Sequence, residues 1–330
     1  MIYYDRRWDG ENGIGRFSRE VAARLTGLAA LPIGGNPASS LDCLKLTFFM
    51  FFSRALVISP GFSGPLLGLK RFVLTVHDLN HIDVDHNSGF LKRIYYRFVL
   101  RRACRRAARV LTVSEFSKSR IVEWAGVPAD QVVCVGNGVS KVFSDSQKND
   151  VSRSTEGGFI FCVGNRKGHK NEVAVIKALS RLQGHGSLRI IFSGFESSEL
   201  VELACRLGVQ DRVEFSGPLS ESELAEKYRT AAMLVFPSLY EGFGLPAVEA
   251  MAVGCPVVTS NTTALGEIAA GAAIGIDPSD TDALADAISR VACSEVLRAD
   301  LQACGFEKCR AFSWDLVADR VKAVVAQMPH

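Results

Sequence analysis

Short runs of β-branched and other apolar residues recur along this chain, and stretches with helical spacing separate them. This alternation is the signal for βαβ units, which build parallel sheets covered by helices. The expected strands lie at 2–4, 55–58, 72–76, 110–113 and 132–135, and then at 159–163, 188–192, 213–215, 233–236 and 256–259. The pattern therefore predicts an α/β protein with two sets of parallel strands.

A polar segment rich in serine and glycine, KVFSDSQKNDVSRSTEGG at 141–158, separates the two sets and is typical of a linker. The chain has 330 residues, enough for two α/β domains of ordinary size. We predict a first domain over 1–150 and a second over 151–312. Ligands of open parallel sheets bind beyond the carboxyl ends of the strands. We therefore expect a ligand in a cleft where the strand ends of the two domains face each other.

The cysteines and the apolar runs indicate the compartment. Nine cysteines form no Cys-x-x-Cys pair and lie mostly inside apolar runs, which indicates reduced thiols rather than a disulfide framework or a zinc site. The N-terminus has no signal-peptide pattern, and the apolar run at 46–52 is too short to span a bilayer. We expect a cytoplasmic protein, either fully soluble or peripheral on the inner face of a membrane.

The segment FPSLYEGFGLPAVEAMAVGCPVV, at 236–258, carries the strongest chemical signal. A strand ends, a glycine-rich turn follows at 241–245, and a helix begins near Pro246, as proline prefers. Backbone N–H groups at such a helix N-terminus favour phosphate and hydroxyl oxygens. Glu241 precedes the helix and Glu249 lies inside it, so the two carboxylates should lie at different depths along one wall. The alternative is a tight turn with a capping acid.

A second glycine loop, CVGNRKGHKN at 162–171, also follows a strand and precedes a helix. Arg166 and Lys170 could neutralise a diphosphate leaving group without a metal ion. The alternative is a solvated basic loop.

Two polar steps follow strands in the first half of the chain. The turn DGENGIGRF contains Gly13 and Gly15, but a lone Gly-x-Gly is a weak signal and the full dinucleotide fingerprint is missing. His77 and Asp78 follow the strand LTV, so they should lie at its carboxyl end and face the ligand. The alternative for His77 is a histidine that only orients its loop.

Two further charged segments point to other ligands. Asp83-Val84-Asp85 has the Asp-x-Asp pattern of some metal sites, but a three-residue match is common by chance and we expect no metal. Residues 92–109, KRIYYRFVLRRACRRAAR, hold eight cations and no acid. This basic segment predicts either a merely solvated helix or one that rests on an anionic membrane surface. Nucleic acid is not expected, because stacking platforms are absent and the net charge is only +3.

The glutamates of EGFGLPAVEAMAVGCPVV, together with the loops above, resemble the retaining glycosyltransferase family 4. The resemblance extends from the Gly13 turn to the helix after Trp314 and is most specific between Phe236 and Thr259. It implies the GT-B fold, which is two Rossmann-like doubly wound parallel-sheet domains facing across a cleft. It also implies that the C-terminal helix, 313–330, packs back on the N-terminal domain.

The resemblance assigns a role to each segment. Glu249 would bind the donor ribose, and Glu241 and the backbone of Gly242, Phe243, Gly244 and Leu245 would contact the transferred sugar. Lys170 and Arg166 would stabilise the departing diphosphate beside Gly164 and Asn165, although many family members have arginine where this chain has Asn165. Gly13 and Gly15 would approach the donor phosphates. His77 and Asp78 would lie near the acceptor hydroxyl, with His77 counted among the catalytic residues.

The implied reaction transfers a hexose, such as mannose, from a nucleoside diphosphate sugar to a glycan or a lipid-linked oligosaccharide, with retention at the anomeric carbon. Such activity serves cell-surface polysaccharide assembly. The donor would be GDP-mannose or a UDP-sugar, with no cofactor and no metal. Two alternatives remain open at this point: a sugar-nucleotide epimerase or hydrolase of the same fold, and a non-catalytic binder of sugar nucleotides.

Overall fold

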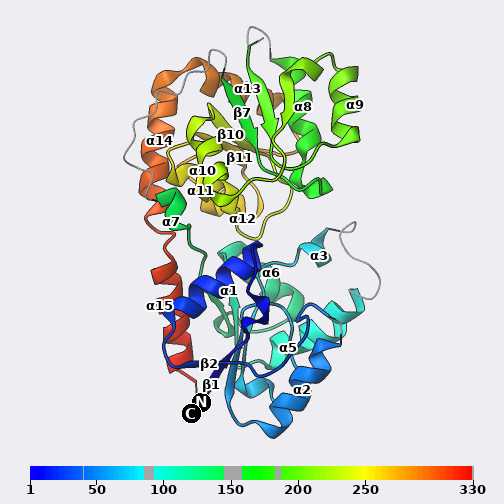
Figure 1. Cartoon of the computed structure of the whole chain (residues 1–330), viewed down its shortest axis with the longest axis vertical. Helices are drawn as coiled ribbons and strands as arrows, with labels where there is room; N and C mark the ends of the chain where they lie inside the picture. Colours follow the sequence, from blue (N-terminus) through cyan, green and yellow to red (C-terminus); the bar gives the residue numbers. More distant parts are fainter. Residues whose placement is uncertain (40, 85–92, 145–157, 183–186, 329–330) are drawn as a thin grey trace. The chain divides into compact units, whose positions relative to one another are not determined.

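The computed structural model describes residues 1–39, 41–84, 93–144, 158–182 and 187–328. The chain forms two compact units, each an α/β layer structure (Figure 1). The first unit comprises Met1–Gly138 and Phe312–His330, and the second comprises Val139–Ala311. The first unit thus ends at Gly138, whereas the sequence predicts a boundary at residue 150.

The first unit contains a six-stranded sheet in which every paired strand is parallel, in the order β2-β1-β3-β4-β5-β6. Its strands are β1 (Ile2–Tyr4), β2 (Leu28–Ala30), β3 (Leu56–Ser59), β4 (Phe72–Thr75), β5 (Arg109–Thr112) and β6 (Val132–Cys134). The sheet is doubly wound, because the chain starts in its interior at β1 and proceeds to both edges.

Helices cover both faces of this sheet. They are α1 (Gly13–Arg24), α2 (Asp42–Phe52), α3 (Asn80–Asp83), the π-helix η4 (Tyr95–Leu100), α5 (Arg101–Arg106), α6 (Glu115–Ala125) and α15 (Trp314–Ala326), with the short 3-10 turns η1 (Arg6–Trp8), η2 (Leu69–Arg71) and η5 (Ala129–Gln131). Side chains of α2, η4, α5 and α6 share one buried core with the strands. The C-terminal helix α15 packs on α1, where Arg24 Nε bonds Asp315 Oδ1 at 2.6 Å and Phe17 meets Trp314 edge to face.

The second unit repeats this architecture with a parallel sheet in the order β12-β11-β10-β7-β8-β9. Its strands are β7 (Phe159–Cys162), β8 (Arg189–Phe192), β9 (Val213–Phe215), β10 (Met233–Phe236), β11 (Val257–Ser260) and β12 (Ile274–Ile276). The register pairs Cys162 with Phe192 and Phe236 with Thr259, so neighbouring strands end at one common edge.

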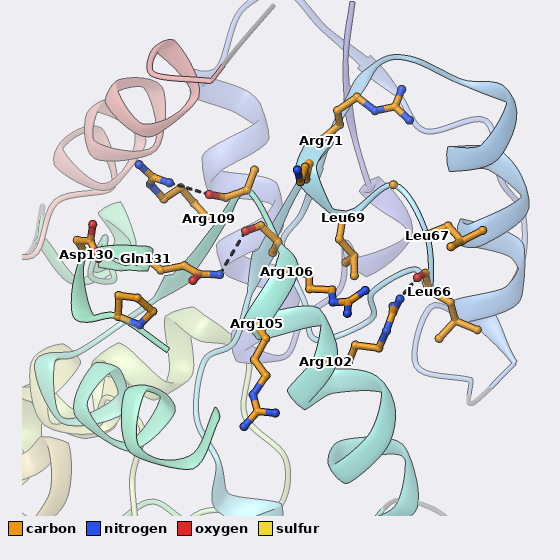
Figure 2. Close-up of a pocket in the computed structure, with 15 residues that line it drawn as sticks. Leu66, Leu67, Leu69, Arg71, Arg102, Arg105, Arg106, Arg109, Asp130 and Gln131 are labelled. Carbon is orange, nitrogen blue, oxygen red and sulfur yellow. Dashed lines mark hydrogen bonds between the residues drawn. The ribbon is translucent and has the colours of Figure 1, made fainter. Parts of the chain in front are cut away.

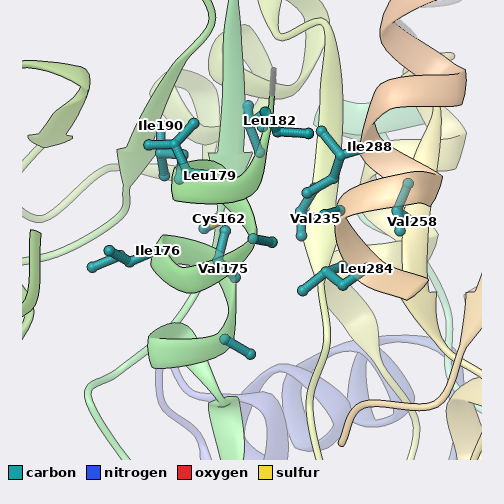
Figure 3. Packing of buried hydrophobic residues seen from close by; sticks show 14 of the residues in the cluster. Cys162, Val175, Ile176, Leu179, Leu182, Ile190, Val235, Val258, Leu284 and Ile288 are labelled. Carbon is teal, nitrogen blue, oxygen red and sulfur yellow. The ribbon is translucent and has the colours of Figure 1, made fainter. Parts of the chain in front are cut away.

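The helices of the second unit are α7 (Lys141–Ser144), α8 (Glu172–Arg181), α9 (Ser198–Arg206), α10 (Glu221–Thr230), α11 (Leu245–Ala252), α12 (Thr263–Ile268), α13 (Thr281–Cys293) and α14 (Glu295–Cys309), with the 3-10 turns η6 (Gly168–Lys170) and η7 (Gln210–Arg212). Figure 3 shows Val175 and Leu179 of α8 and Ile288 of α13 packed toward Val235 and Val258 of the sheet. Burial of this aliphatic layer holds the strand ends in place, at roughly 25 cal/mol for each Å² of apolar surface removed from water.

All ten strands expected from the sequence are present to within a residue at either end. The strands β2 and β12 were not predicted; they are three-residue strands at the edges of the two sheets. The first four residues of the expected linker are helical. Lys141–Ser144 forms α7, because Phe143 is fully buried and lies against Tyr228 of α10.

Candidate active site

The carboxyl edge of the second sheet brings two loops together that lie far apart in the sequence. Asn171 connects the loop after β7 to the turn after β10. Its side-chain amide donates hydrogen bonds to the carbonyls of Pro237 at 3.2 Å and Pro278 at 2.7 Å. Leu239 N also donates to the His169 carbonyl at 2.7 Å. Asn171 has φ 56°, a left-handed conformation that asparagine tolerates better than most residues. These hydrogen bonds between the two loops were not predicted from the sequence.

Lys170 and Glu241 form the ion pair at the centre of this edge. Lys170 Nζ lies 2.6 Å from Glu241 Oε1, and each side chain is only 14% exposed. The same ammonium group lies 5.0 Å from the centre of the Phe236 ring, on β10. The structure therefore brings together the two site residues on which the sequence analysis most depends. Each charge compensates the other while both stay within reach of solvent.

The glycine-rich turn sets the start of α11 beside this pair. Gly244 is the N-terminal capping residue with φ +103°, and a Cβ there would overlap Leu265 Cδ2, so no other residue fits without rearrangement. Gly244 has no side chain with which to cap the helix, and Pro246 lies in the first turn. Gly242 and Phe243 are buried and Leu245 is half-buried. A helix N-terminus favours anions, but in this first turn Pro246 has no N–H and Ala247 N already donates to the Gly244 carbonyl at 3.0 Å.

Arg166 is held by many contacts within the second unit. Its guanidinium donates to the carbonyls of Ser193 at 2.7 Å and Phe195 at 2.7 and 3.0 Å, and it forms an ion pair with Glu172. It also lies over the rings of Phe192 and Phe215. Burial raises the pKa of Glu172 and the charge of Arg166 opposes that rise. Arg166 would have to give up these bonds to reach a diphosphate, whereas Lys170 makes one ion pair within the described part of the chain, with Glu241.

The residues beside Arg166 occupy the turn after β7. The Gly164 N–H donates to Ser193 Oγ at 3.2 Å, which ties the turn to the end of β8. Asn165 is exposed, and its side-chain oxygen accepts from Lys167 N at 3.4 Å. These contacts shape the loop that carries Lys170.

Glu249 lies deeper in the unit than the other candidates. It is 4% exposed, and its Oε2 accepts a hydrogen bond of 3.2 Å from Tyr228 Oη of α10, which is fully buried. Tyr228 in turn meets Phe161 of β7 edge to face. The two glutamates thus differ in environment. Glu241 pairs with a cation, whereas Glu249 on α11 is buried against α10. No sequence pattern predicts the role of Tyr228.

The candidates of the first unit lie at the start of α1 and at the end of β4. Asn12 caps α1 by accepting from Gly15 N at 2.8 Å, and a Cβ on Gly15 would overlap the Gly10 backbone. Gly13 is the exposed first residue of the helix. Asp78 Oδ1 accepts from Asn80 N at 3.0 Å at the start of α3, so one of its oxygens serves the loop.

His77 is packed edge to face on Phe17 of α1, and its Nε2 lies 2.9 Å from the Pro60 carbonyl oxygen. A carbonyl can only accept, so Nε2 carries the proton, and Nδ1 of the neutral ring is left as a base. Burial lowers the pKa of His77 below its usual value of 6.5. The imidazole is therefore neutral at neutral pH.

The burial of His77 predicts a pH dependence of stability. Its pKa is lower in the folded than in the unfolded state, so the unfolded state binds the proton more readily. We expect the free energy of unfolding to fall as the pH drops through the unfolded-state pKa of about 6.5. Urea unfolding at about pH 7.5 and about pH 5.5 should show a smaller loss for His77→Gln than for wild type. An equal loss would contradict the assignment.

Within the described residues, the first aspartate of the Asp-x-Asp pattern forms an ion pair. Asp83 makes two bonds with Arg120 of α6, at 2.7 and 3.1 Å, while Asp85 lies outside the described residues. Among the described residues, no group of histidine, cysteine, aspartate or glutamate side chains could hold a metal ion.

The basic segment forms a partly buried helix rather than a merely solvated one. Lys92 lies outside the described residues, the chain is helical without a break from Arg93 to Arg106 through η4 and α5, and Arg109 starts β5. Arg102 and Arg105 donate to the backbone carbonyls of Leu66 and Ala125, so part of its charge binds a neighbouring loop and the C-terminal end of α6. No described helix is both long and apolar enough to cross a bilayer.

Comparison with known proteins gives a consistent result. Residues 143–307 match the family model of the glycosyl transferases group 1, and residues 55–141 match that of glycosyltransferase family 4. The O-antigen chain mannosyltransferase B of Escherichia coli is 30% identical over 75% of this chain and 68% of its own length. The O-antigen chain mannosyltransferase RfbU of Salmonella typhimurium is 28% identical over 73% and 66%. The crystal structure of Anabaena HepE with UDP and glucose superimposes with a TM-score of 0.75 at 18% identity, over 98% of each chain.

Proposed function

The chain belongs to glycosyltransferase family 4, and on that premise we propose that it transfers a hexose from a nucleoside diphosphate sugar to an acceptor hydroxyl. It is a glycosyltransferase with the GT-B fold. The proposed sugar is mannose or a similar hexose, because two of the relatives are O-antigen mannosyltransferases. The proposed product is a cell-surface polysaccharide, and the proposed acceptor is a glycan or a lipid-linked oligosaccharide.

The observation that carries this proposal is the ion pair between Lys170 and Glu241 in the turn that leads into α11. A departing diphosphate needs positive charge and N–H donors, and a reacting sugar needs a carboxylate near its hydroxyls or its developing positive charge. Here the cation and the carboxylate lie 2.6 Å apart, Lys170 Nζ to Glu241 Oε1. In our proposal the diphosphate takes the place of Glu241 as the counterion of Lys170, and the freed carboxylate then contacts the sugar.

The other residues of the second unit support this exchange. Glu249 would bind the ribose hydroxyls, oriented by its bond from Tyr228. The backbone of Gly242–Leu245 would contact the sugar. Arg166, with Gly164 and Asn165, would act mainly by holding the loop of Lys170, because its guanidinium is already bonded to carbonyls and to Glu172.

The first unit would supply the acceptor side. His77 and Asp78 are the proposed acceptor residues, and Gly13 and Gly15 are proposed to approach the donor phosphates. The neutral ring of His77, with Nδ1 unprotonated, could orient an acceptor hydroxyl by accepting its hydrogen bond. We propose that the departing diphosphate itself receives the acceptor proton. The new glycosidic bond would form on the face that the diphosphate leaves, which retains the anomeric configuration.

A thermal-shift panel of nucleotides tests the proposal. We expect GDP, UDP or one of their sugars to raise the Tm by roughly 5–10 °C at about a hundredfold excess over its Kd, because such binding adds about 2.7 kcal/mol. The shift should survive a chelator, since Lys170 supplies the charge that a metal would otherwise provide. A panel without any shift, or a shift that a chelator abolishes, would contradict the proposed donor site.

The two alternatives predict different products. A sugar-nucleotide epimerase or hydrolase would convert the donor fully without an acceptor, and a non-catalytic binder would leave it intact. The family match and the mannosyltransferase relatives do not favour either alternative. Chromatography of the donor after incubation with and without a polysaccharide acceptor separates the three, because only the transferase needs the acceptor for turnover.

We also propose that the protein works at the cytoplasmic face of a membrane, where a lipid-linked acceptor would be found. The basic segment 92–109 would attract anionic lipids, each exposed cation contributing about 1 kcal/mol near the surface. In the described part of that segment, Arg93, Arg97, Arg105 and Arg106 are exposed.

A further inference from the structure

The amino edge of the first sheet carries a cationic pocket that the transfer reaction does not use. The pocket has a volume of about 750 Å³ and lies between η2, α5 and η5 (Figure 2). Six cations line it together with a single carboxylate, that of Asp130; the cations are Lys70, Arg71, Arg102, Arg105, Arg106 and Arg109. A hollow with this excess of positive charge favours a multiply charged anion such as phosphate.

The bonds within the pocket fix some of these cations and leave others exposed. Arg102 donates to the Leu66 carbonyl, and Arg71 donates to the carbonyls of Ser53 at 2.6 Å and Met50 at 3.2 Å. Lys70 and Arg106 are exposed, and the described residues give neither side chain a recorded bond. Figure 2 shows Arg102 and Arg106 extending toward the segment that contains Leu66 and Leu69.

An exposed aromatic face lies on α2, next to this pocket. Phe48, Phe51 and Phe52 are 70%, 69% and 70% exposed, and their rings meet at centroid distances of 4.9 and 5.0 Å. The inner face of α2 is already buried through Leu46 and Met50. The helix is therefore apolar on both faces, which a helix surrounded by water would not favour.

Hydrogen bonds connect the pocket to α2. Arg71 of the pocket binds carbonyls in and just after the last turn of α2, and Leu66 N donates to Thr47 Oγ1 of α2 at 2.7 Å. Leu67, half exposed, lines the pocket between them. The end of α2, η2, α5 and η5 lie at or near the starts of β3, β4, β5 and β6. Parallel strands start at one edge, so this surface lies on the edge opposite His77.

We propose that this surface docks the protein on an anionic phospholipid bilayer. The phenyl groups of α2 enter the interface between head groups and acyl chains, and the cationic pocket takes lipid phosphates. Charge complementarity selects this occupant: an exposed aromatic cluster beside six cations matches the layered apolar and anionic structure of such a membrane. The proposal rests on the proposed transfer to a lipid-linked acceptor. It adds that α2, rather than the basic segment alone, contacts the bilayer.

Vesicle sedimentation tests this with variants whose side chains are exposed and outside the candidate active site. Phe48→Ser/Phe51→Ser/Phe52→Ser should weaken binding to vesicles of phosphatidylcholine and phosphatidylglycerol on the order of 100-fold. Lys70→Gln/Arg106→Gln should weaken it about 30-fold. The matched controls lie on the second unit, Lys177→Gln/Arg206→Gln for charge and Val296→Ser for an exposed apolar residue, and should bind as wild type does.

Each of the following results would overturn the proposal. The first is equal binding to vesicles of phosphatidylcholine alone. The second is wild-type vesicle binding by both surface variants. The third is a dimer, seen by analytical ultracentrifugation, that the phenylalanine variant dissociates without losing vesicle binding. Inorganic pyrophosphate distinguishes a bilayer from a free phosphate ligand. If pyrophosphate binds the pocket and the phenylalanine substitutions leave vesicle binding unchanged, the pocket serves a free anion and the docking proposal fails.

A separate readout keeps this test independent of the proposed reaction. The nucleotide-induced Tm shift should be the same in both surface variants and in wild type, because Lys170 and Glu241 lie in the second unit. Phe51→Trp adds a direct probe of insertion. Its fluorescence should shift to the blue and be quenched by brominated lipid on anionic vesicles, and an unchanged spectrum with bound protein would contradict insertion of α2.

Discussion

Replacing Lys170 with alanine is expected to lower kcat/KM on the order of 1000-fold, because a charge aimed at a developing anion contributes a large part of the catalytic free energy. The reason lies in the pair that it forms with Glu241 at 2.6 Å, where both groups are 14% exposed. The loss should appear mainly in kcat, because the charge on the diphosphate oxygens grows as the bond to the sugar breaks.

The same change also affects the folded protein, and a second variant separates the two effects. Without Lys170 the Glu241 carboxylate is left largely buried without its cation, which we expect to cost about 1–3 kcal/mol of stability. Lys170→Ala/Glu241→Gln should recover that stability, measured by urea unfolding, and should stay inactive. Lys167→Ala, which removes an exposed lysine of the same loop, serves as the control and should stay active. Normal turnover by Lys170→Ala would refute the proposed role.

Replacing Gly244 with alanine is expected to lower kcat/KM at least about 100-fold and to destabilise the second unit by about 2–3 kcal/mol. Two causes add. The residue has φ +103°, and its new Cβ would overlap Leu265 Cδ2. Either Leu265 or the turn must then move, and we expect the strained turn to shift the start of α11, and with it the backbone proposed to contact the donor. Because a displacement of about 1 Å can cost about 100-fold in rate, activity should fall more than stability does.

Two further variants separate the effect of backbone strain from that of the overlap with Leu265. Gly208→Ala, at φ +68° with no atom within 4 Å of a new Cβ, measures backbone strain away from the site and should leave activity intact. Gly244→Ala/Leu265→Ala removes the overlap while keeping the strain, and should regain part of the activity. If Gly244→Ala turns over as fast as Gly208→Ala, the turn does not position the donor.

The sequence predicted the regular part of the fold because the signal lay in local patterns. Ten strands have apolar runs that periodicity reveals. β2 and β12 escaped because they are edge strands of three residues, LAA and IGI, with partly exposed side chains that carry little periodic signal. The segment at Lys141 looked like a linker by composition. Only tertiary packing of Phe143 against Tyr228 makes it the helix α7 of the second unit.

The candidate site was predictable in its parts and less so in its pairing. The rule that parallel strands end at one edge predicts that the loops after β7 and β10 meet, and the structure adds that Lys170 and Glu241 pair directly. The bonds of Arg166 to Ser193 and Phe195 could not be predicted, because they depend on the end of β8. The burial of Glu249 beside Tyr228 likewise depends on how α10 packs against α11.

A crystal structure of the protein with a nucleoside diphosphate tests the central claim most directly. We expect the diphosphate within hydrogen-bond distance of Lys170 Nζ and of the first turn of α11, with the distance from Lys170 Nζ to Glu241 Oε1 longer than its present 2.6 Å. A bound nucleotide elsewhere, with the ion pair still closed, would contradict the account.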